Sequence, residues 1–128
     1  MLVIIPYYAA FLALIFILLS LNVIRGRGKH RVALGSRDIS DLERRIRVHG
    51  NFAEYVPFTL LLLTMVELQG LPHAILHGLS LCLILGRLSH AWGVSQTAEK
   101  LTFRVAGMVL TFTALGGSAL AIIFGGMS

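Results

Sequence analysis

The strongest constraint on the fold is a set of long apolar runs. The first run contains no charged residue from Leu2 to Ile24. At about 1.5 Å per helical residue it reaches roughly 34 Å, which is enough to cross a hydrocarbon core of ~30 Å. A signal peptide is a poorer interpretation, because no basic segment precedes the run and the run is too long. We therefore predict a first transmembrane helix here.

Three further apolar runs follow, and the composition supports four membrane spans. Of the 128 residues, 56% are hydrophobic and 13% are charged, and the mean hydropathy is +0.82. A soluble domain of this size would leave most residues in contact with water and could not hide so much apolar surface. We predict a single all-α domain over residues 1–128, an integral membrane four-helix bundle. The expected spans are residues 2–24, 45–68, 73–92 and 101–124.

The basic residues gather in two of the three connecting loops. The segment Arg25–Ile39 is rich in arginine and interrupted by glycines, so we expect a polar loop there. The next helix would begin with a capping box, in which Ser40 is the N-cap and Glu43 reaches back to it. The third loop is bordered by Lys100 and Arg104, whereas the second loop and both termini carry no Lys or Arg. The first and third loops should therefore face the cytoplasm, and both termini should face away from it.

The net charge of +5 does not indicate a nucleic-acid partner. Most of the 11 Lys and Arg residues lie between Arg25 and Arg47, as expected of a loop that faces anionic lipid headgroups. No basic patch is interleaved with aromatic residues that would stack on bases. Cys82 is the only cysteine, so an intrachain disulfide is impossible, and its apolar surroundings favour a small buried filler.

A polar stripe enters the second apolar run. It consists of Arg47, Asn51, Glu54 and Tyr55. Their spacing of i, i+4, i+7 and i+8 places them along one face of a helix. Ionisable residues inside a membrane are costly and commonly mark binding sites, although a polar seam that only joins helices is the alternative. Partners for Glu54 could be Arg47 on the same face, or Arg87 and Arg104 from other spans or another subunit.

These residues predict a cytoplasm-facing pocket for a small zwitterionic or anionic ligand. Arginine can bind a carboxylate through two hydrogen bonds, while Glu54 can hold an amine. An arginine beside a bound thiol would lower the pKa of that thiol and favour the nucleophilic thiolate. The alternative for Arg87 and Arg104 is that they are anchors at helix ends whose charged groups extend to the membrane surface.

The segment Arg47–Pro57, RVHGNFAEYVP, resembles the signature Arg-x-x-x-Asn-x-x-Glu-Tyr-x-Pro of the MAPEG family. These are the membrane-associated proteins in eicosanoid and glutathione metabolism. The resemblance covers the whole chain, with four spans, a basic first loop, an arginine late in the third span and another early in the fourth. The third-span segment GRLSHAWG, residues 86–93, resembles bacterial members in particular.

The resemblance implies a homotrimer in the bacterial inner membrane, with glutathione bound as substrate between neighbouring subunits on the cytoplasmic side. The expected activity is that of a glutathione transferase or peroxidase acting on lipophilic small molecules that arrive from the membrane lipids. Arg104 matches the arginine that stabilises the thiolate in catalytic members. The residues expected to bind glutathione are Arg27, Arg47, Asn51, Glu54, Tyr55, Arg87 and His90.

Other functions are weaker interpretations. His90 and Val94 stand where several eukaryotic members carry tyrosines, which favours a non-catalytic lipid- or ligand-binding protein of the same fold as the alternative. A small four-helix multidrug exporter is disfavoured, because such transporters carry an essential carboxylate in the first helix and the first span here is uncharged. His73 and His77 are four residues apart and could bind zinc with Glu67, but no further ligand is evident, so we predict no metal site.

Overall fold

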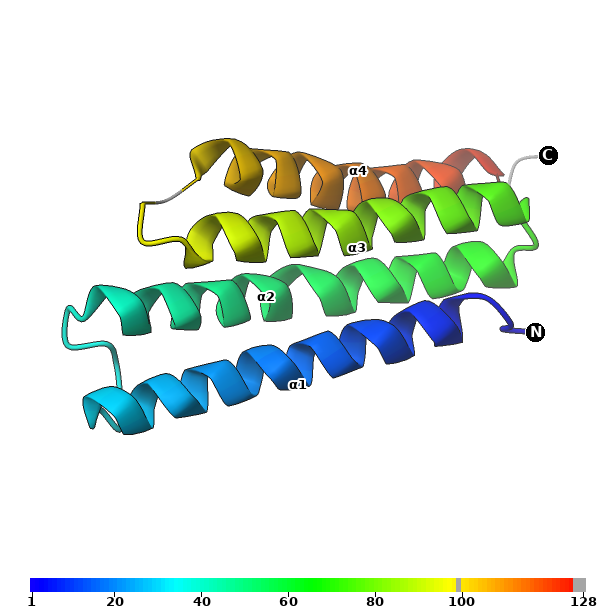
Figure 1. The fold of residues 1–128 in the computed structure, drawn as a ribbon. Coiled ribbons are helices and arrows are strands. Elements are labelled where there is room, and N and C mark those ends of the chain that lie inside the picture. The colour runs from blue at the N-terminus through cyan, green and yellow to red at the C-terminus, as the bar shows by residue number, and fades with distance from the viewer. Residues whose placement is uncertain (99, 126–128) are drawn as a thin grey trace.

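The computed structural model describes residues 1–98 and 100–125, and this part of the chain forms four antiparallel helices lying side by side (Figure 1). The helices are α1 (Ile5–His30), α2 (Ser40–Leu68), α3 (His73–Ser95) and α4 (Leu101–Gly125). Each helix is long and apolar enough to cross a membrane. The expected all-α, four-helix fold is therefore confirmed. The expected domain of residues 1–128 also includes residue 99 and residues 126–128, which lie outside the described residues.

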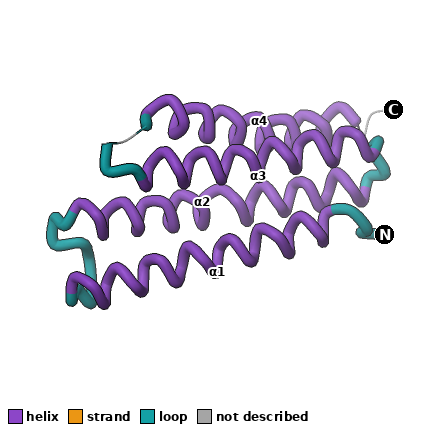
Figure 2. The backbone as a smooth tube through the Cα atoms, viewed as in Figure 1, coloured by secondary structure: helices purple, strands orange, loops and turns teal. Residues whose placement is uncertain are grey.

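The loops divide between the two ends of the bundle. The α1–α2 and α3–α4 connections lie at one end, and the α2–α3 turn lies at the other end with both termini (Figure 2). The two basic loops of the sequence are therefore neighbours in space. This arrangement follows from short connections, which make successive helices antiparallel.

Helix α1 is longer than predicted at its C-terminal end. It continues beyond Ile24 to His30, so the prediction that glycines and positive charges end the helix before Arg25 was wrong. Gly26 is buried against α2, and a Cβ atom there would lie only 2.6 Å from Arg45 Cδ. The last turn carries the cationic side chains of Arg27 and Lys29, which interact favourably with the helix dipole.

Helix α2 has Ser40 as its first residue, so Ser40 is not the N-cap and the predicted capping box is absent. The N-cap residue is Ile39, which makes no side-chain cap hydrogen bond, and the backbone N–H of Glu43 donates to the Ile39 carbonyl at 2.9 Å. The first turn instead connects to α1, because Asp41 Oδ2 lies 2.8 Å from His30 Nε2. The start of α2 is therefore set by a contact with the preceding helix. Farther along, α2 continues through Pro57.

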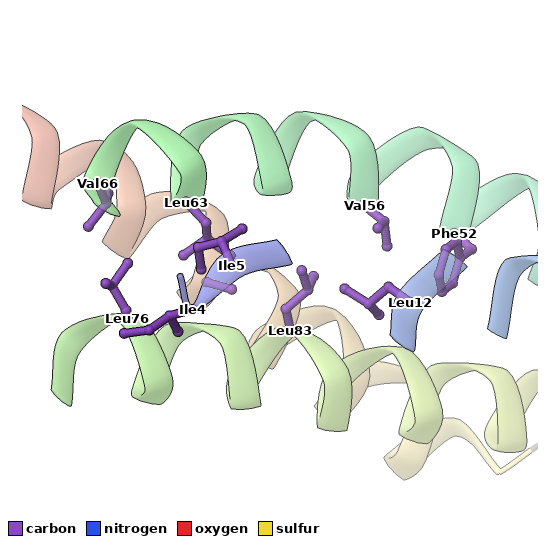
Figure 3. Packing of buried hydrophobic residues seen from close by; sticks show 10 residues of the cluster. Ile4, Ile5, Leu12, Phe52, Val56, Leu63, Val66, Leu76 and Leu83 are labelled. Atoms are coloured by element: carbon purple, nitrogen blue, oxygen red, sulfur yellow. The ribbon is translucent and has the colours of Figure 1, made fainter. Parts of the chain in front are cut away.

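The apolar core joins all four helices, and Figure 3 shows it from close by. Its members are Ile4, Ile5, Leu12, Phe52, Val56, Leu63, Val66, Leu76, Leu83 and Ala114, with Cys82 among the partly buried residues packed against it. Many other large apolar side chains point outward, including Leu18 and Phe124, each 65% exposed. Such surface is unfavourable in water and is expected of helices that contact lipid or another subunit.

Helices α3 and α4 approach each other most closely at glycines. A Cβ atom on Gly107 would lie 2.6 Å from both Gly86 O and His90 N, and one on Gly93 would lie 2.8 Å from Arg104 N. These contacts are possible only without side chains, as at close helix crossings in membranes. On α3, Gly86 is one of the residues that permit this approach. The glycines bring the ends of α3 and α4 together beside the site described below.

The end of the bundle that holds the termini contains a buried carboxylate. Glu67 is 7% exposed, and it accepts hydrogen bonds from the backbone N–H groups of Val3, Ile4 and Ile5 at 2.5, 2.7 and 2.7 Å. His77 Nδ1 lies 2.7 Å from the Tyr8 hydroxyl oxygen. Glu67 and His77 therefore have other partners than a metal, and the described residues contain no group of three metal-binding side chains.

Candidate functional site

A polar cavity of about 490 Å³ opens at the end of the bundle that carries the α1–α2 and α3–α4 loops. We call it the arginine cavity. It is lined by Asp38, Ser40, Glu43, Arg44, Arg47, Asn51, His90, Val94 and Arg104. Asp38 belongs to the α1–α2 loop, and the other residues come from α2, α3 and α4. Three helices and a loop thus bring residues that are distant in the sequence to one place.

Helix geometry explains why α2 supplies most of the lining. Ser40, Arg44, Arg47 and Asn51 follow one another at intervals of four, three and four residues, which places them on one face of a helix. Arg47 and Asn51 belong to the predicted stripe. The earlier members were missed because the prediction began the stripe at Arg47, although the same spacing continues back to Ser40.

Two of the predicted residues on α3 and α4 also reach the cavity. His90 is buried, at 4% exposed, and Arg104 is exposed. Both line the arginine cavity opposite α2. Their approach depends on the glycine contacts between α3 and α4 described above.

Glu54 has a different place from the one expected. It does not line the cavity; instead its Oε1 lies 3.8 Å from Nη1 of Arg47, with both side chains about half exposed. This pairing agrees with the expectation that Arg47 is a partner of Glu54 on the same helical face. Because the pair is exposed at the surface of the single chain, its contribution to stability is small.

Tyr55 and Arg87 do not line the cavity; Tyr55 is half-buried, and Arg87 lies inside the bundle. Arg87 is 2% exposed, and its Nε and Nη2 atoms donate to Thr111 Oγ1 at 3.1 and 2.7 Å. Its Nη1 atom donates to Asn51 Oδ1, and its Cζ atom lies 5.8 Å from the centre of the Tyr55 ring. Arg87 is therefore a buried connection between helices, and it is not an anchor extending to the membrane surface.

Arg27 is not brought to the cavity within one chain. Its Nη1 atom donates to the carbonyl oxygens of Gly35 and Val32 at 2.8 and 3.4 Å. The guanidinium therefore holds the α1–α2 loop against the end of α1. A contact between Arg27 and a ligand in this cavity remains a prediction that depends on a neighbouring subunit.

Three charged lining residues were not predicted as site residues from the sequence. Arg44 donates to the carbonyl oxygens of Val94 and Thr97 at 3.0 and 3.5 Å, so it joins α2 to the end of α3. Asp38 and Glu43 add two carboxylates. Helical spacing indicates Arg44 and Glu43, but Asp38 lies in the loop with a left-handed backbone at φ 59°, and no local pattern predicts its position.

The charges of the cavity indicate the chemistry that it can bind. The lining includes three guanidinium groups and two carboxylates, beside the neutral amide of Asn51. Guanidinium groups bind carboxylates and other anions through charge-assisted hydrogen bonds, and the carboxylates can receive an ammonium group. The arrangement therefore fits a small ligand with several negative groups and one positive group.

Comparison with known proteins supports a membrane protein. The sequence pattern of the MAPEG family matches residues 5–124. The inner membrane protein YecN of Escherichia coli strain K12 is 35% identical over 108 residues, which cover 84% of this chain and 81% of that protein. YecN of Escherichia coli O6:H1 matches with the same values, and no solved structure matches. With four helices able to cross a membrane, the chain is an integral membrane protein that belongs to the MAPEG family.

Proposed function

We propose that the chain binds glutathione in the arginine cavity and acts as a glutathione transferase or peroxidase on lipophilic electrophiles. The observation that carries this proposal is the convergence of Arg44, Arg47 and Arg104 around one cavity. Glutathione carries two carboxylates and a thiol that becomes a third anion when it ionises, and three guanidinium groups match these. Its single ammonium group matches the carboxylates of Asp38 and Glu43. Family membership supports the same ligand.

Arg104 would act on the thiol of the bound ligand. A guanidinium close to a thiol favours the ionised form, which is the reactive nucleophile. The proton passes to water, the thiolate sulfur bonds to the electrophilic carbon, and the leaving group departs with its electron pair. With a hydroperoxide, the thiolate sulfur bonds to the terminal peroxide oxygen, the O–O bond breaks, and the alcohol departs after taking a proton from water. Glutathione is left as a sulfenic acid. The thiol of a second glutathione then attacks the sulfenic sulfur, which forms a disulfide and releases the sulfenic oxygen as water.

Self-association is part of the proposal. Helix α2 exposes an apolar stripe, the α2 seam, which consists of Phe58, Leu61, Met65 and Leu68. Its intervals of three, four and three residues are those of helices that pack along a shared seam. We propose that these seams join three copies and bring Glu54, Tyr55 and Arg27 toward a ligand held between subunits. The trimer would lie in the inner membrane, as the name of YecN suggests, with both basic loops in the cytoplasm.

The catalytic proposal is tested by the ultraviolet absorbance of the thiolate. Purified protein in detergent should show this absorbance when glutathione is added near neutral pH, because Arg104 favours the ionised thiol. Arg104→Ala should lose the signal, and Arg104→Lys should keep part of it. Arg25→Ala, which alters an exposed α1 arginine outside the cavity, is the control and should retain it. Absence of the signal in the unaltered protein would refute the catalytic role.

The second candidate function is ligand binding without chemistry, and the lining of α3 favours it. Val94 is 5% exposed and presents an aliphatic side chain to the cavity, and His90 lies one turn before it. Neither residue offers a hydroxyl group. A binding protein of this kind would show isothermal titration heats and thermal stabilisation with glutathione, yet would conjugate it to no member of an electrophile panel. Conjugation of any electrophile would exclude this candidate.

A further inference from the structure

We propose that Arg87 is a positioning residue that fixes the amide group of Asn51 with its NH₂ group toward the arginine cavity. Beside the NH₂ group of Asn51, the cavity would then bind only a ligand group that accepts hydrogen bonds, and a carboxylate is such a group. This inference rests on the proposed function for the identity of the ligand. It goes beyond that function by assigning Arg87 a role without ligand contact.

The surroundings of Arg87 explain why its hydrogen bonds are fixed. The side chain is buried, and no carboxylate of the described residues forms an ion pair with it. A buried guanidinium without a carboxylate is stable only when neutral acceptors bind its N–H groups. Thr111 Oγ1 receives two of them, and Met108 Sδ lies 3.4 Å from Nη2.

Thr111 is suited to this role because its own proton is already used. Its hydroxyl donates to the Gly107 carbonyl at 2.7 Å, so the lone pairs of Oγ1 remain for Arg87. Gly107 is one of the glycines at the α3–α4 contact. The guanidinium is thus held from two sides, by α4 at Thr111 and by α2 at Asn51.

The orientation of Asn51 follows from the chemistry of arginine. A guanidinium has only donors, so the atom of Asn51 that faces Nη1 of Arg87 must be the amide oxygen. Rotating the amide by half a turn would place two N–H groups against each other. Asn51 lines the cavity and Arg87 does not. The NH₂ group is therefore the part of the amide left to face a ligand.

The consequence is that Asn51 adds an N–H donor to those of the three arginines in the cavity lining. Arg44, Arg47 and Arg104 surround the cavity, and the charge of Arg87 stands behind the amide. A carboxylate at this position would accept from Asn51 and from the arginines. An amide or alcohol in the same position would lack the charge that these groups bind best.

Asn51→Asp is the most informative variant. It offers Arg87 a carboxylate partner inside the bundle, so the unfolding temperature should stay the same or rise. It also places a carboxylate oxygen toward the cavity, so the affinity for glutathione should fall by about tenfold or more. Asn22→Asp is the matched control, because Asn22 Oδ1 likewise accepts from an arginine, Arg45, at 2.9 Å, away from the cavity. Its glutathione affinity should be unchanged.

Thr111→Val tests whether Arg87 acts through its anchor. The substitution keeps the shape and removes the acceptor, and Thr111 does not line the cavity. Glutathione should bind more weakly, and the ratio of its affinity to that of glutathione with amidated carboxylates should become smaller. Thr111→Ser should restore both. A purely structural role would lower both affinities equally and leave this preference unchanged.

Titration calorimetry and thermal unfolding in detergent together decide the outcome. Unchanged glutathione affinity in Asn51→Asp would overturn the inference, as would an unchanged ligand preference in Thr111→Val. Absence of binding in the unaltered protein would refute the proposed function by itself. In that case the unfolding temperature tests the contact between Arg87 and residue 51 separately. An unfolding temperature of Asn51→Asp equal to or above that of the unaltered protein supports the contact. A decrease as large as that of Asn51→Ala overturns it.

Discussion

Replacing Glu67 by glutamine would test how α1 is attached to the rest of the bundle. The start of α1 has no side-chain cap of its own, and the carboxylate of Glu67 from α2 replaces one. Glu67 Oε1 accepts from the N–H groups of Val3 and Ile4, and Oε2 accepts from Ile5. Glutamine keeps one oxygen, but it would place an NH₂ group against the N–H of Ile5.

The size of the effect follows from these three bonds. A hydrogen bond to a charged group contributes about 1.5–3 kcal/mol, and a buried donor left without a partner costs about 1–3 kcal/mol. The glutamine side chain is uncharged, and it has one acceptor oxygen where the carboxylate has two. We therefore expect the free energy of unfolding to fall by about 2–3 kcal/mol. The unfolding temperature should decrease by roughly 5–10 °C.

Thermal unfolding in detergent measures the global effect, and hydrogen exchange at the amides of Val3, Ile4 and Ile5 measures the local one. Exchange at these amides should become faster in Glu67→Gln. Glu43→Gln is the matched control, because Glu43 is an exposed glutamate at the other end of α2. Unchanged exchange at the three amides, or a temperature decrease no larger than that of the control, would show that Glu67 does not hold α1.

Two further predictions concern helix contacts. Gly107→Ala should destabilise the protein by about 1–3 kcal/mol, because its Cβ atom would meet Gly86 O at 2.6 Å; Gly116→Ala, which meets open space, should be neutral or stabilising by up to about 1 kcal/mol. Equal unfolding temperatures for the two variants would contradict the close crossing. Leu61→Gln in the α2 seam should shift the protein from oligomer to monomer in native mass spectrometry. Val109→Gln on α4, at a position 58% exposed, is the control and should leave the oligomer intact. An intact oligomer in Leu61→Gln would exclude the α2 seam as the contact between subunits.

The broad architecture was predictable because the signals for it are local. An uncharged run of sufficient length must form a helix in a bilayer, where each backbone group needs an internal partner. Helical spacing likewise places Arg47 and Asn51 on one face without knowledge of the neighbours. The error at Arg25 arose because Gly26 was treated as a helix breaker, while in the structure it accommodates Arg45 from another helix.

Four membrane-spanning helices and the polar stripe on the second follow from patterns within single segments of the chain. Which polar side chains meet depends on how the helices pack: Arg104 and His90 reach the cavity, Arg87 lies behind it, and Glu54 turns outward to Arg47. This is because the rotation of each helix about its axis is set by contacts with other helices. The glycine crossing between α3 and α4 and the loop that carries Asp38 are such contacts, and no pattern within one helix contains them.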